Sequence, residues 1–211
     1  DNTTSANSTA VGYNALAVNN GGQNQAFGAF TLDSNTTGIY NTAMGYAALS
    51  ANVSGNYNVA VGGRGVLDSC VSGLGNVAVG GYSTLGSLDD GDYNVALGHL
   101  TGQTLEGGSN NVLIGRQAGL NIVDADSNTC VGYFSGNDIT SGTSNTCIGS
   151  NAGNTLTTGL GNTLLGRNAE PSAADVSNEI TLGSSAVVTL RCQQTSISAL
   201  SDARDKDEIQ D

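Results

Sequence analysis

The chain has 211 residues, of which 31 are glycine, one is proline and none is tryptophan, and only 11% carry a charge. Disordered segments normally bring charge and proline, and ordinary globular domains bring more bulky apolar residues, so this composition fits neither class. Six basic against eighteen acidic residues give a net charge of −12, so few basic residues are available for the clustered positive surface that nucleic acid requires, and nucleic acid is not expected as a partner. The composition favours stacked β-coils, whose narrow interior small side chains can fill.

Membrane and metal partners are not expected either. No apolar run approaches the roughly 20 residues that span a bilayer, and the first residues carry no charged-then-apolar signal segment. The cysteines show no CxxC pair and no close Cys/His spacing, so we predict no zinc site and no cofactor. We interpret them as buried small apolar side chains: Cys70, Cys130, Cys147 and Cys192.

One glycine recurs along the chain at intervals of 16 to 18 residues, most often 17, within a consensus Asn-x-small-apolar-Gly. Clean copies are Asn58-Val-Ala-Val-Gly62 and Asn128-Thr-Cys-Val-Gly132. Such a period is the signature of a solenoid. These anchor glycines are Gly12, Gly28, Gly45, Gly62, Gly80, Gly98, Gly115, Gly132, Gly149, Gly166 and Gly183, and the repeat asparagines are Asn24, Asn41, Asn58, Asn76, Asn94, Asn111, Asn128, Asn145 and Asn162.

Each copy of the motif predicts a short strand, because glycine recurs too often for a helix interior. Alternate strand positions face one side, so the Asn, the small residue and the Gly share a face that lines the coil. The two intervening apolar residues share the other face, which would pack toward the axis of a trimer. The predicted fold is all-β, a parallel β-solenoid of about eleven 17-residue coils with stacked Asn ladders, roughly 50 Å long.

Several local features follow from the same alignment. Three positions after each anchor we expect a small residue, including Gly65 and Ser83. We interpret Asn178-Glu-Ile-Thr-Leu-Gly183 as inserting one residue into the repeat, and Val187-Val-Thr-Leu190 as a last strand. The predicted organisation is a solenoid domain over residues 1–170, a terminal coil and neck over 171–200, and the start of a further domain over 201–211.

The repeat Asn-x-Ala-Val-Gly-x-x-Ala resembles the head repeat of trimeric autotransporter adhesins over about residues 7–187. That resemblance implies a parallel β-roll in which three chains pack into a compact trimer. The unit is longer here than is typical of that family, so we expect its loops to bulge further.

The C-terminal stretch resembles the junction in phage tail fibres and tailspikes that precedes an endosialidase-type intramolecular chaperone. It carries Asn178-Glu-Ile-Thr-Leu-Gly183, Thr189-Leu-Arg-Cys-Gln193 and Ser201-Asp-Ala-Arg-Asp-Lys206. The resemblance implies a chaperone that trimerises, assists folding and cuts itself off at the Ser201-Asp202 bond. Ser201 would be the nucleophile and Lys206 its basic partner, since a serine hydroxyl needs a base to accept its proton. Because the sequence ends at Asp211, residues 201–211 would be the truncated start of that domain.

A few polar residues could indicate metal binding or catalysis, but we favour structural interpretations for them. Asp89-Asp-Gly-Asp92 and Asp124-Ala-Asp126 look like pieces of calcium loops, but neither is complete, so we predict solvated turns and no metal site. His99 is interpreted as a surface residue.

Two stacked sets of side chains are also expected. Cys130 and Cys147 occupy the same slot in adjacent coils, where free thiols are favoured over a strained disulfide. Tyr40, Tyr57 and Tyr93 would form an aromatic ladder, for which packing across coils is favoured over sugar binding.

The sequence thus predicts a structural protein of a virion, a tail fibre or tailspike segment that attaches to the host surface, with no enzyme activity beyond autocleavage. Its expected partners are two further copies of itself, a host cell-surface glycan or protein receptor, and other virion tail proteins. A bacterial surface adhesin or extracellular filament subunit is the alternative. A polysaccharide depolymerase is least favoured, because no paired carboxylates recur in a cleft-like context.

Overall fold

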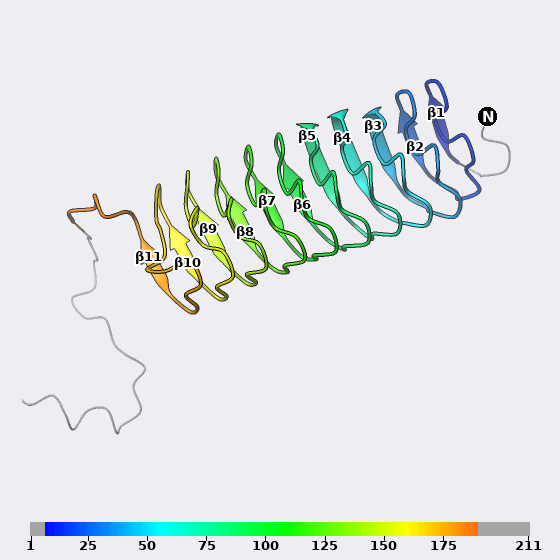
Figure 1. Ribbon diagram of the computed structural model, residues 1–211. Helices are drawn as coiled ribbons and strands as arrows, with labels where there is room; N and C mark the ends of the chain where they lie inside the picture. The colour runs from blue at the N-terminus through cyan, green and yellow to red at the C-terminus, as the bar shows by residue number, and fades with distance from the viewer. Residues whose placement is uncertain (1–6, 190–211) are drawn as a thin grey trace, which may run out of the picture.

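In the computed structural model, residues 7–189 are described, and they form one elongated rod of stacked coils (Figure 1). Each coil contributes one strand, and the strands form a single parallel sheet in chain order. No helix occurs in this described part of the chain. The strands are β1 (Thr9–Val11), β2 (Gln25–Phe27), β3 (Thr42–Tyr46), β4 (Val59–Arg64), β5 (Val77–Tyr82), β6 (Val95–Leu97), β7 (Val112–Ile114), β8 (Thr129–Val131), β9 (Thr146–Ile148), β10 (Thr163–Leu165) and β11 (Ile180–Leu182). The predicted parallel β-solenoid is confirmed.

The strands divide their side chains between two faces as the motif predicts. In β4, Ala60 has no exposed surface, whereas Val59 and Val61 on either side of it are partly exposed. Equivalent residues lie opposite one another in neighbouring strands, so that Ala60 pairs with Ala78. The inward row is therefore small because it fills the interior of each coil.

The two 18-residue intervals place their additional residue directly after the anchor glycine, where β4 and β5 run on for six residues each. The inward small position is therefore taken by Val66 and Thr84, both fully buried. The main-chain oxygen of Val66 accepts a hydrogen bond from Leu49 N at 3.2 Å, as the equivalent residues do elsewhere. The expectation that Gly65 and Ser83 fill this position is wrong, because the inserted residue shifts the count by one.

The C-terminal end departs from prediction in two places. Leu165 of β10 pairs directly with Leu182 of β11, so no residue is inserted. Glu179 takes the Asn slot of this coil, and its main-chain N–H donates to Oδ1 of Asn162 at 2.9 Å. Residues 187–189 form no strand, and Val188 is 96% exposed; Leu190, the last residue of the predicted strand, lies outside the described residues.

Three rows of buried residues fill the interior, and the sizes of the residues in the strand row and the turn row change about halfway along the rod. Up to Leu85 the strands contribute alanine and the next turn contributes leucine. From Leu113 to Gly153 the strands contribute larger residues and the next turn contributes glycine, and the coil between them combines Ala96 with Gly102. The strand row is Ala26, Ala43, Ala60, Ala78, Ala96, Leu113, Cys130, Cys147 and Leu164; the turn row is Leu16, Leu32, Leu49, Leu67, Leu85, Gly102, Gly119, Gly136 and Gly153; the return row is Asn19, Asn35, Asn52, Cys70, Leu88, Leu105, Ile122, Ile139 and Leu156.

Candidate functional surfaces of the rod

The nine predicted repeat asparagines lie buried in one continuous ladder. Asn111 is representative: its Oδ1 accepts from the main-chain N–H of Asn128 at 2.9 Å, and its Nδ2 donates to the carbonyl of Ala125 at 2.9 Å. Each side chain thus links its coil to the backbone of the next coil. Five also donate to the Oδ1 of the preceding Asn at 3.0–3.2 Å. With donors and acceptors used inside the rod, this ladder is structural.

A second, shorter Asn ladder was not anticipated. Asn35 Nδ2 donates to Asn19 Oδ1 at 2.5 Å, and Asn52 Nδ2 donates to Asn35 Oδ1 at 2.6 Å. The ladder ends where Cys70 takes the next slot, so Asn52 Oδ1 is buried without a hydrogen-bond partner. The sequence feature that could have predicted this ladder is an Asn seven residues after each of the first three anchor glycines.

The predicted anchor glycines stack where neighbouring coils approach most closely. From Gly28 to Gly166, all but Gly80 have φ between 116° and 152°, a region that only glycine adopts without strain. A Cβ on Gly98 would lie 2.7 Å from the carbonyl oxygen of Gly115. These residues are therefore required by the backbone and offer no side chain to a ligand.

The autocleavage residues Ser201 and Lys206 lie outside the described residues, as does Cys192, so self-cleavage stays a prediction. Cys130 and Cys147 lie opposite each other in β8 and β9 as free, buried thiols, which confirms the expected stacking. A hydrogen bond with Cys147 and burial raise the pKa of the Cys130 thiol well above its usual range, and burial raises the pKa of Cys70 to about 11. Thiols held protonated in this way are poor nucleophiles at neutral pH.

The acidic turns that look like calcium loops bind main-chain groups of the preceding coil. Asp92 Oδ1 accepts from Leu74 N at 2.8 Å, and Asp126 Oδ1 accepts from Ser109 N at 2.7 Å. In the described part of the chain, no three His, Cys, Asp or Glu side chains converge as a metal site. The interpretation as turns is therefore favoured by the contacts these carboxylates make.

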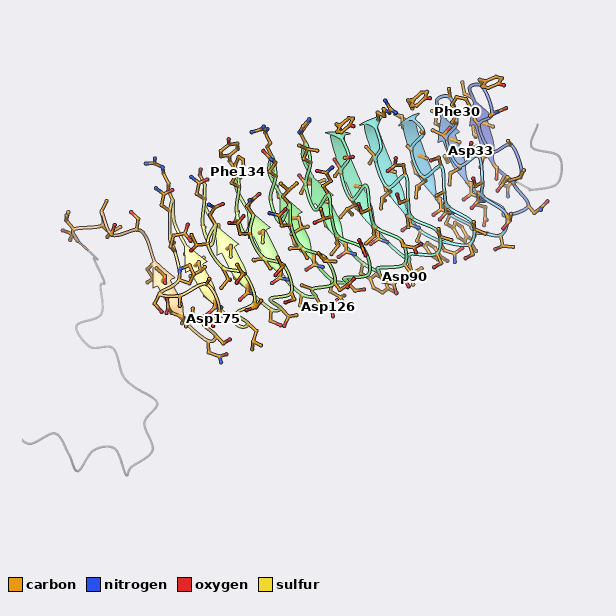
Figure 2. The ribbon with its side chains drawn as sticks, viewed as in Figure 1. Phe30, Asp33, Asp90, Asp126, Phe134 and Asp175 are labelled. Atoms are coloured by element: carbon orange, nitrogen blue, oxygen red, sulfur yellow. The ribbon has the colours of Figure 1, made fainter. Side chains whose placement is uncertain are left out.

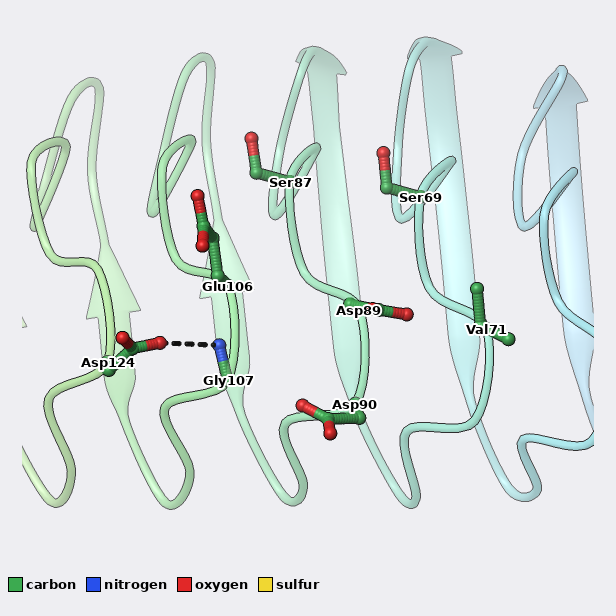
Figure 3. Close-up of a pocket in the computed structure, with 8 residues that line it drawn as sticks. All are labelled: Ser69, Val71, Ser87, Asp89, Asp90, Glu106, Gly107 and Asp124. Carbon is green, nitrogen blue, oxygen red and sulfur yellow. Dashed lines mark hydrogen bonds between the residues drawn. The ribbon is translucent and has the colours of Figure 1, made fainter.

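A shallow depression of about 530 Å³ lies on the return side of the central coils (Figure 3). Four carboxylates line it, although the sequence pattern indicates no paired carboxylates in a cleft. One of them, Asp124, accepts from Gly107 N at 3.2 Å through Oδ1. The depression is open, and its lining residues are Ser69, Val71, Ser87, Asp89, Asp90, Glu106, Gly107 and Asp124.

The expected tyrosine ladder forms in part. The rings of Tyr40 and Tyr57 stack with centroids 4.9 Å apart and an angle of 9° between their planes. Gly75 occupies the next coil, so Tyr93 is separated from that pair by one rung. Packing across coils is confirmed for Tyr40 and Tyr57.

An exposed row of aromatic and basic side chains follows the carboxyl ends of the strands, and we call it the basic aromatic edge. It contains all three arginines of residues 7–189 and the single histidine of the chain. Figure 2 shows Phe30 and Phe134 along this upper edge, and Asp90, Asp126 and Asp175 along the lower one. Sequence reasoning missed the row, although every member directly follows an anchor glycine or its neighbour. The members are Tyr13, Tyr46, Arg64, Tyr82, His99, Arg116, Tyr133 and Arg167.

The first and third residues of every strand point outward and form the outer face of the sheet, and none of these is Asp, Glu, Lys, Arg or His. Arg64, the last residue of β4, lies beyond these positions and belongs to the basic aromatic edge. The row nearer the strand ends is apolar throughout and leaves Met44 46%, Val79 39% and Ile148 41% exposed. This row is Val11, Phe27, Met44, Val61, Val79, Leu97, Ile114, Val131, Ile148, Leu165 and Leu182.

Residues 7–189 contain no helix long and apolar enough to cross a membrane. The described residues present three distinct surfaces: the outer sheet face, the basic aromatic edge and the acidic return side. Searches of protein-family models, curated proteins and solved structures each found no match to this chain.

Proposed function

We propose that the chain is a structural segment of a virion fibre, a tail fibre or tailspike, that assembles as a homotrimer and presents a surface to the host cell. The single observation that carries this proposal is the uncharged outer face of the sheet. The resemblance of the repeat to trimeric adhesin heads, and of the C-terminal stretch to the fibre junction, supplies the number of chains and the setting.

The chemistry of the outer face favours another copy of the chain as its partner. Each chain carries a net charge of −12, so copies repel one another unless they meet through an uncharged surface. The outer face provides that surface over its whole length, with partly exposed Val, Ile, Leu and Met side chains. Burial of such apolar area stabilises an assembly by roughly 25 cal/mol per Å².

The repeat spacing also favours a copy of the same chain. Strands within the sheet succeed one another every 4.8 Å or so, and the outward rows repeat at that spacing through eleven strands. A partner must match this rise to remain in register along the rod, and a second copy does so by construction. Three copies around an axis parallel to the rod would enclose the three outer faces.

Such a rod suits a spacer that transmits position without bending. Its coils are joined by the sheet, by the Asn ladder and by further main-chain hydrogen bonds along the turns, for example from Leu85 N to Thr101 O at 3.0 Å. The described part has no second layer and no linker between coils (Figure 1).

Sedimentation equilibrium of the chain tests the proposal. We expect a particle of three times the 21.1 kDa chain mass, and we expect Val79→Lys to dissociate it, because three ammonium groups would be buried near one axis. Ser72→Lys is the matched control, since Ser72 is exposed on the return side of the neighbouring coil. A wild-type monomer at micromolar concentration, or equal dissociation by both variants, would contradict the assembly.

A further inference from the structure

We propose that the basic aromatic edge binds an extended acidic polysaccharide, a linear chain of carboxylated sugars. The inference rests on the proposed function and deepens it, because it names the class of host-surface molecule that the fibre would contact.

Charge segregation is the first argument. The chain is strongly acidic overall, yet Arg64, Arg116 and Arg167 share one edge with His99. Acidic side chains such as Asp90 and Asp126 gather on the opposite edge (Figure 2). Because salt screens exposed charges beyond about 8 Å at physiological ionic strength, the local sign of the edge decides what it attracts. The three arginines therefore make this edge the part of the described surface best suited to an anionic ligand, although Asp68 lies close enough to Arg64 to interact with it electrostatically.

Arg116 is held in position for a carboxylate. Its Nη1 donates to Tyr133 Oη at 3.2 Å. Its guanidinium carbon lies 5.6 Å from the ring centre of Tyr133 and 5.8 Å from that of Phe134. Stacking of this kind limits the rotamers of the side chain and leaves further N–H groups for a bidentate bond to a carboxylate.

The aromatic rings of the edge are exposed and mutually supported. Tyr13 is 70% exposed and Tyr133 47% exposed. Phe30 packs edge-on against Tyr13 and Tyr46 at 5.4 and 5.7 Å, and the Tyr82 ring stacks on His99 at 6.1 Å. Tyrosine offers a ring face to the apolar face of a sugar and a hydroxyl group to its polar rim.

Aromatic and basic members succeed one another along the edge in step with the coils. Arg64 lies directly between Tyr46 and Tyr82 in the sheet register. His99, Arg116 and Tyr133 follow in the next three coils. The rise of about 4.8 Å per coil is comparable to the advance of one six-membered ring along an extended polysaccharide. Successive sugars would therefore meet a ring to stack on or a cation to pair with.

The shape of the edge favours a linear ligand. The acidic depression described above lies on the return side, and no member of the edge lines it. A ligand lying along the edge would make several weak contacts, one in most coils, which together give avidity. A trimer would present three such edges.

The test uses the full chain and immobilised polygalacturonate, hyaluronan, alginate and polysialic acid, each compared with its methyl ester. We expect retention of at least one acidic polymer, loss of that retention after esterification, and weakening by added salt. Arg116→Gln and Tyr133→Ala should each raise Kd about tenfold, equivalent to about 1.4 kcal/mol. The Kd of Arg116→Lys should lie between those of the wild type and Arg116→Gln, because lysine keeps the positive charge but lacks the paired N–H groups that bind a carboxylate at two points.

Tyr93→Ala is the matched control, because Tyr93 is equally exposed but lies at the opposite ends of the strands. No retention of any of the four polymers, or equal weakening by Tyr93→Ala and Tyr133→Ala, would overturn the inference. Sedimentation and adsorption of labelled chain to bacterial cells are measured in parallel. If the chain is a trimer that adsorbs to cells but binds none of the polymers, the proposed fibre function remains and the polysaccharide inference fails. If the chain is a monomer that binds a polymer but does not adsorb to cells, the fibre function fails and the polysaccharide inference remains.

Discussion

The side-chain amides of the repeat asparagines hydrogen-bond to main-chain groups of the next coil, and Asn111 shows why the residue must be asparagine. Its acceptor meets the N–H of Asn128 and its donor meets the carbonyl of Ala125, both in the next coil. Aspartate would place an acceptor against that carbonyl, and serine is too short to reach both groups. In the last coil of the described residues, Glu179 shows that the slot tolerates another residue.

Replacing Asn111 by alanine should therefore destabilise the rod strongly. The change leaves one buried N–H and one buried carbonyl without these partners, at about 1–3 kcal/mol for each group. We expect the free energy of unfolding to fall by roughly 3 kcal/mol in urea titrations followed by circular dichroism. Asn121→Ala is the control, since the Asn121 amide makes one 3.5 Å hydrogen bond at the half-buried surface. Similar losses for both variants would contradict the role given to the ladder.

The anchor glycines make a second prediction at the residue scale. Gly98 has φ of 140° and lies beneath the carbonyl of Gly115, so Gly98→Ala combines backbone strain with a clash. The expected loss is about 3 kcal/mol in thermal or chemical unfolding. Gly81→Ala is matched to it, because the nearest atom to its Cβ would be His99 Cδ2 at 3.8 Å. If the Gly81 variant proved as unstable as the Gly98 variant, close coil stacking would not be the reason for the glycine.

At the scale of the coil, interior volume is shared between the strand and the following turn. Leu113 fills the middle of β7, and Gly119 in the turn row leaves space for it. A Cβ on Gly119 would lie 2.7 Å from Leu113 Cδ2 and 2.9 Å from Ile122 Cδ1. In the first half of the rod the arrangement is reversed, with alanine in the strand and leucine in the turn.

A double-mutant cycle measures this exchange. Leu113→Ala alone should cost about 3 kcal/mol through the cavity it leaves, and Gly119→Ala alone should also destabilise, through the clash. The double variant should lose about 1 kcal/mol less free energy of unfolding than the sum of the two single losses, because the new methyl group of residue 119 enters the space vacated at residue 113. Leu113→Ala combined with Gly153→Ala, two coils away, should be additive. Additivity in both pairs would refute the volume exchange.

For the whole molecule, each coil depends on its immediate neighbours. Strands pair only with the preceding and following strand, so stability is approximately a sum of coil and interface terms. A whole coil can therefore be deleted without removing contacts between the remaining coils, whereas a deletion of that size in a globular domain would disrupt the shared core.

Removal of residues 116–132, one full interval between anchors, should leave a folded rod. The deletion brings β9 beside β7 in the register that β8 now occupies, and small-angle scattering should show a rod shorter by about 4.8 Å. Removal of residues 116–124 alone should disrupt folding, because the residues left between Gly115 and Gly132 are too few to complete a coil and bring β8 beside β7. Loss of the circular dichroism signal in the full-coil deletion would show that the coils are not interchangeable units.

Much of this architecture was predictable from the sequence, because in a stacked solenoid the same residue recurs in the same environment. The interval between Gly62 and Gly80 identifies neighbouring coils, and the alternation around Ala60 identifies the buried face. The slot of Glu179 was misread because Asn178, one residue earlier, imitates the consensus Asn. The interval from Gly166 to Gly183 and the register of β11 with β10 both place Glu179 in the slot.

By itself the sequence determined the period, the strand in each coil, the Asn ladder and the uncharged sheet face, since each of these is a repeated local pattern. Only the tertiary structure decided which varied residues meet. Leu113 and Gly119 compensate in volume across the interior, and Arg116 and Tyr133 form part of an exposed edge. The physical reason is that these relations depend on contacts between coils at positions without a consensus, where one-dimensional repetition carries no signal.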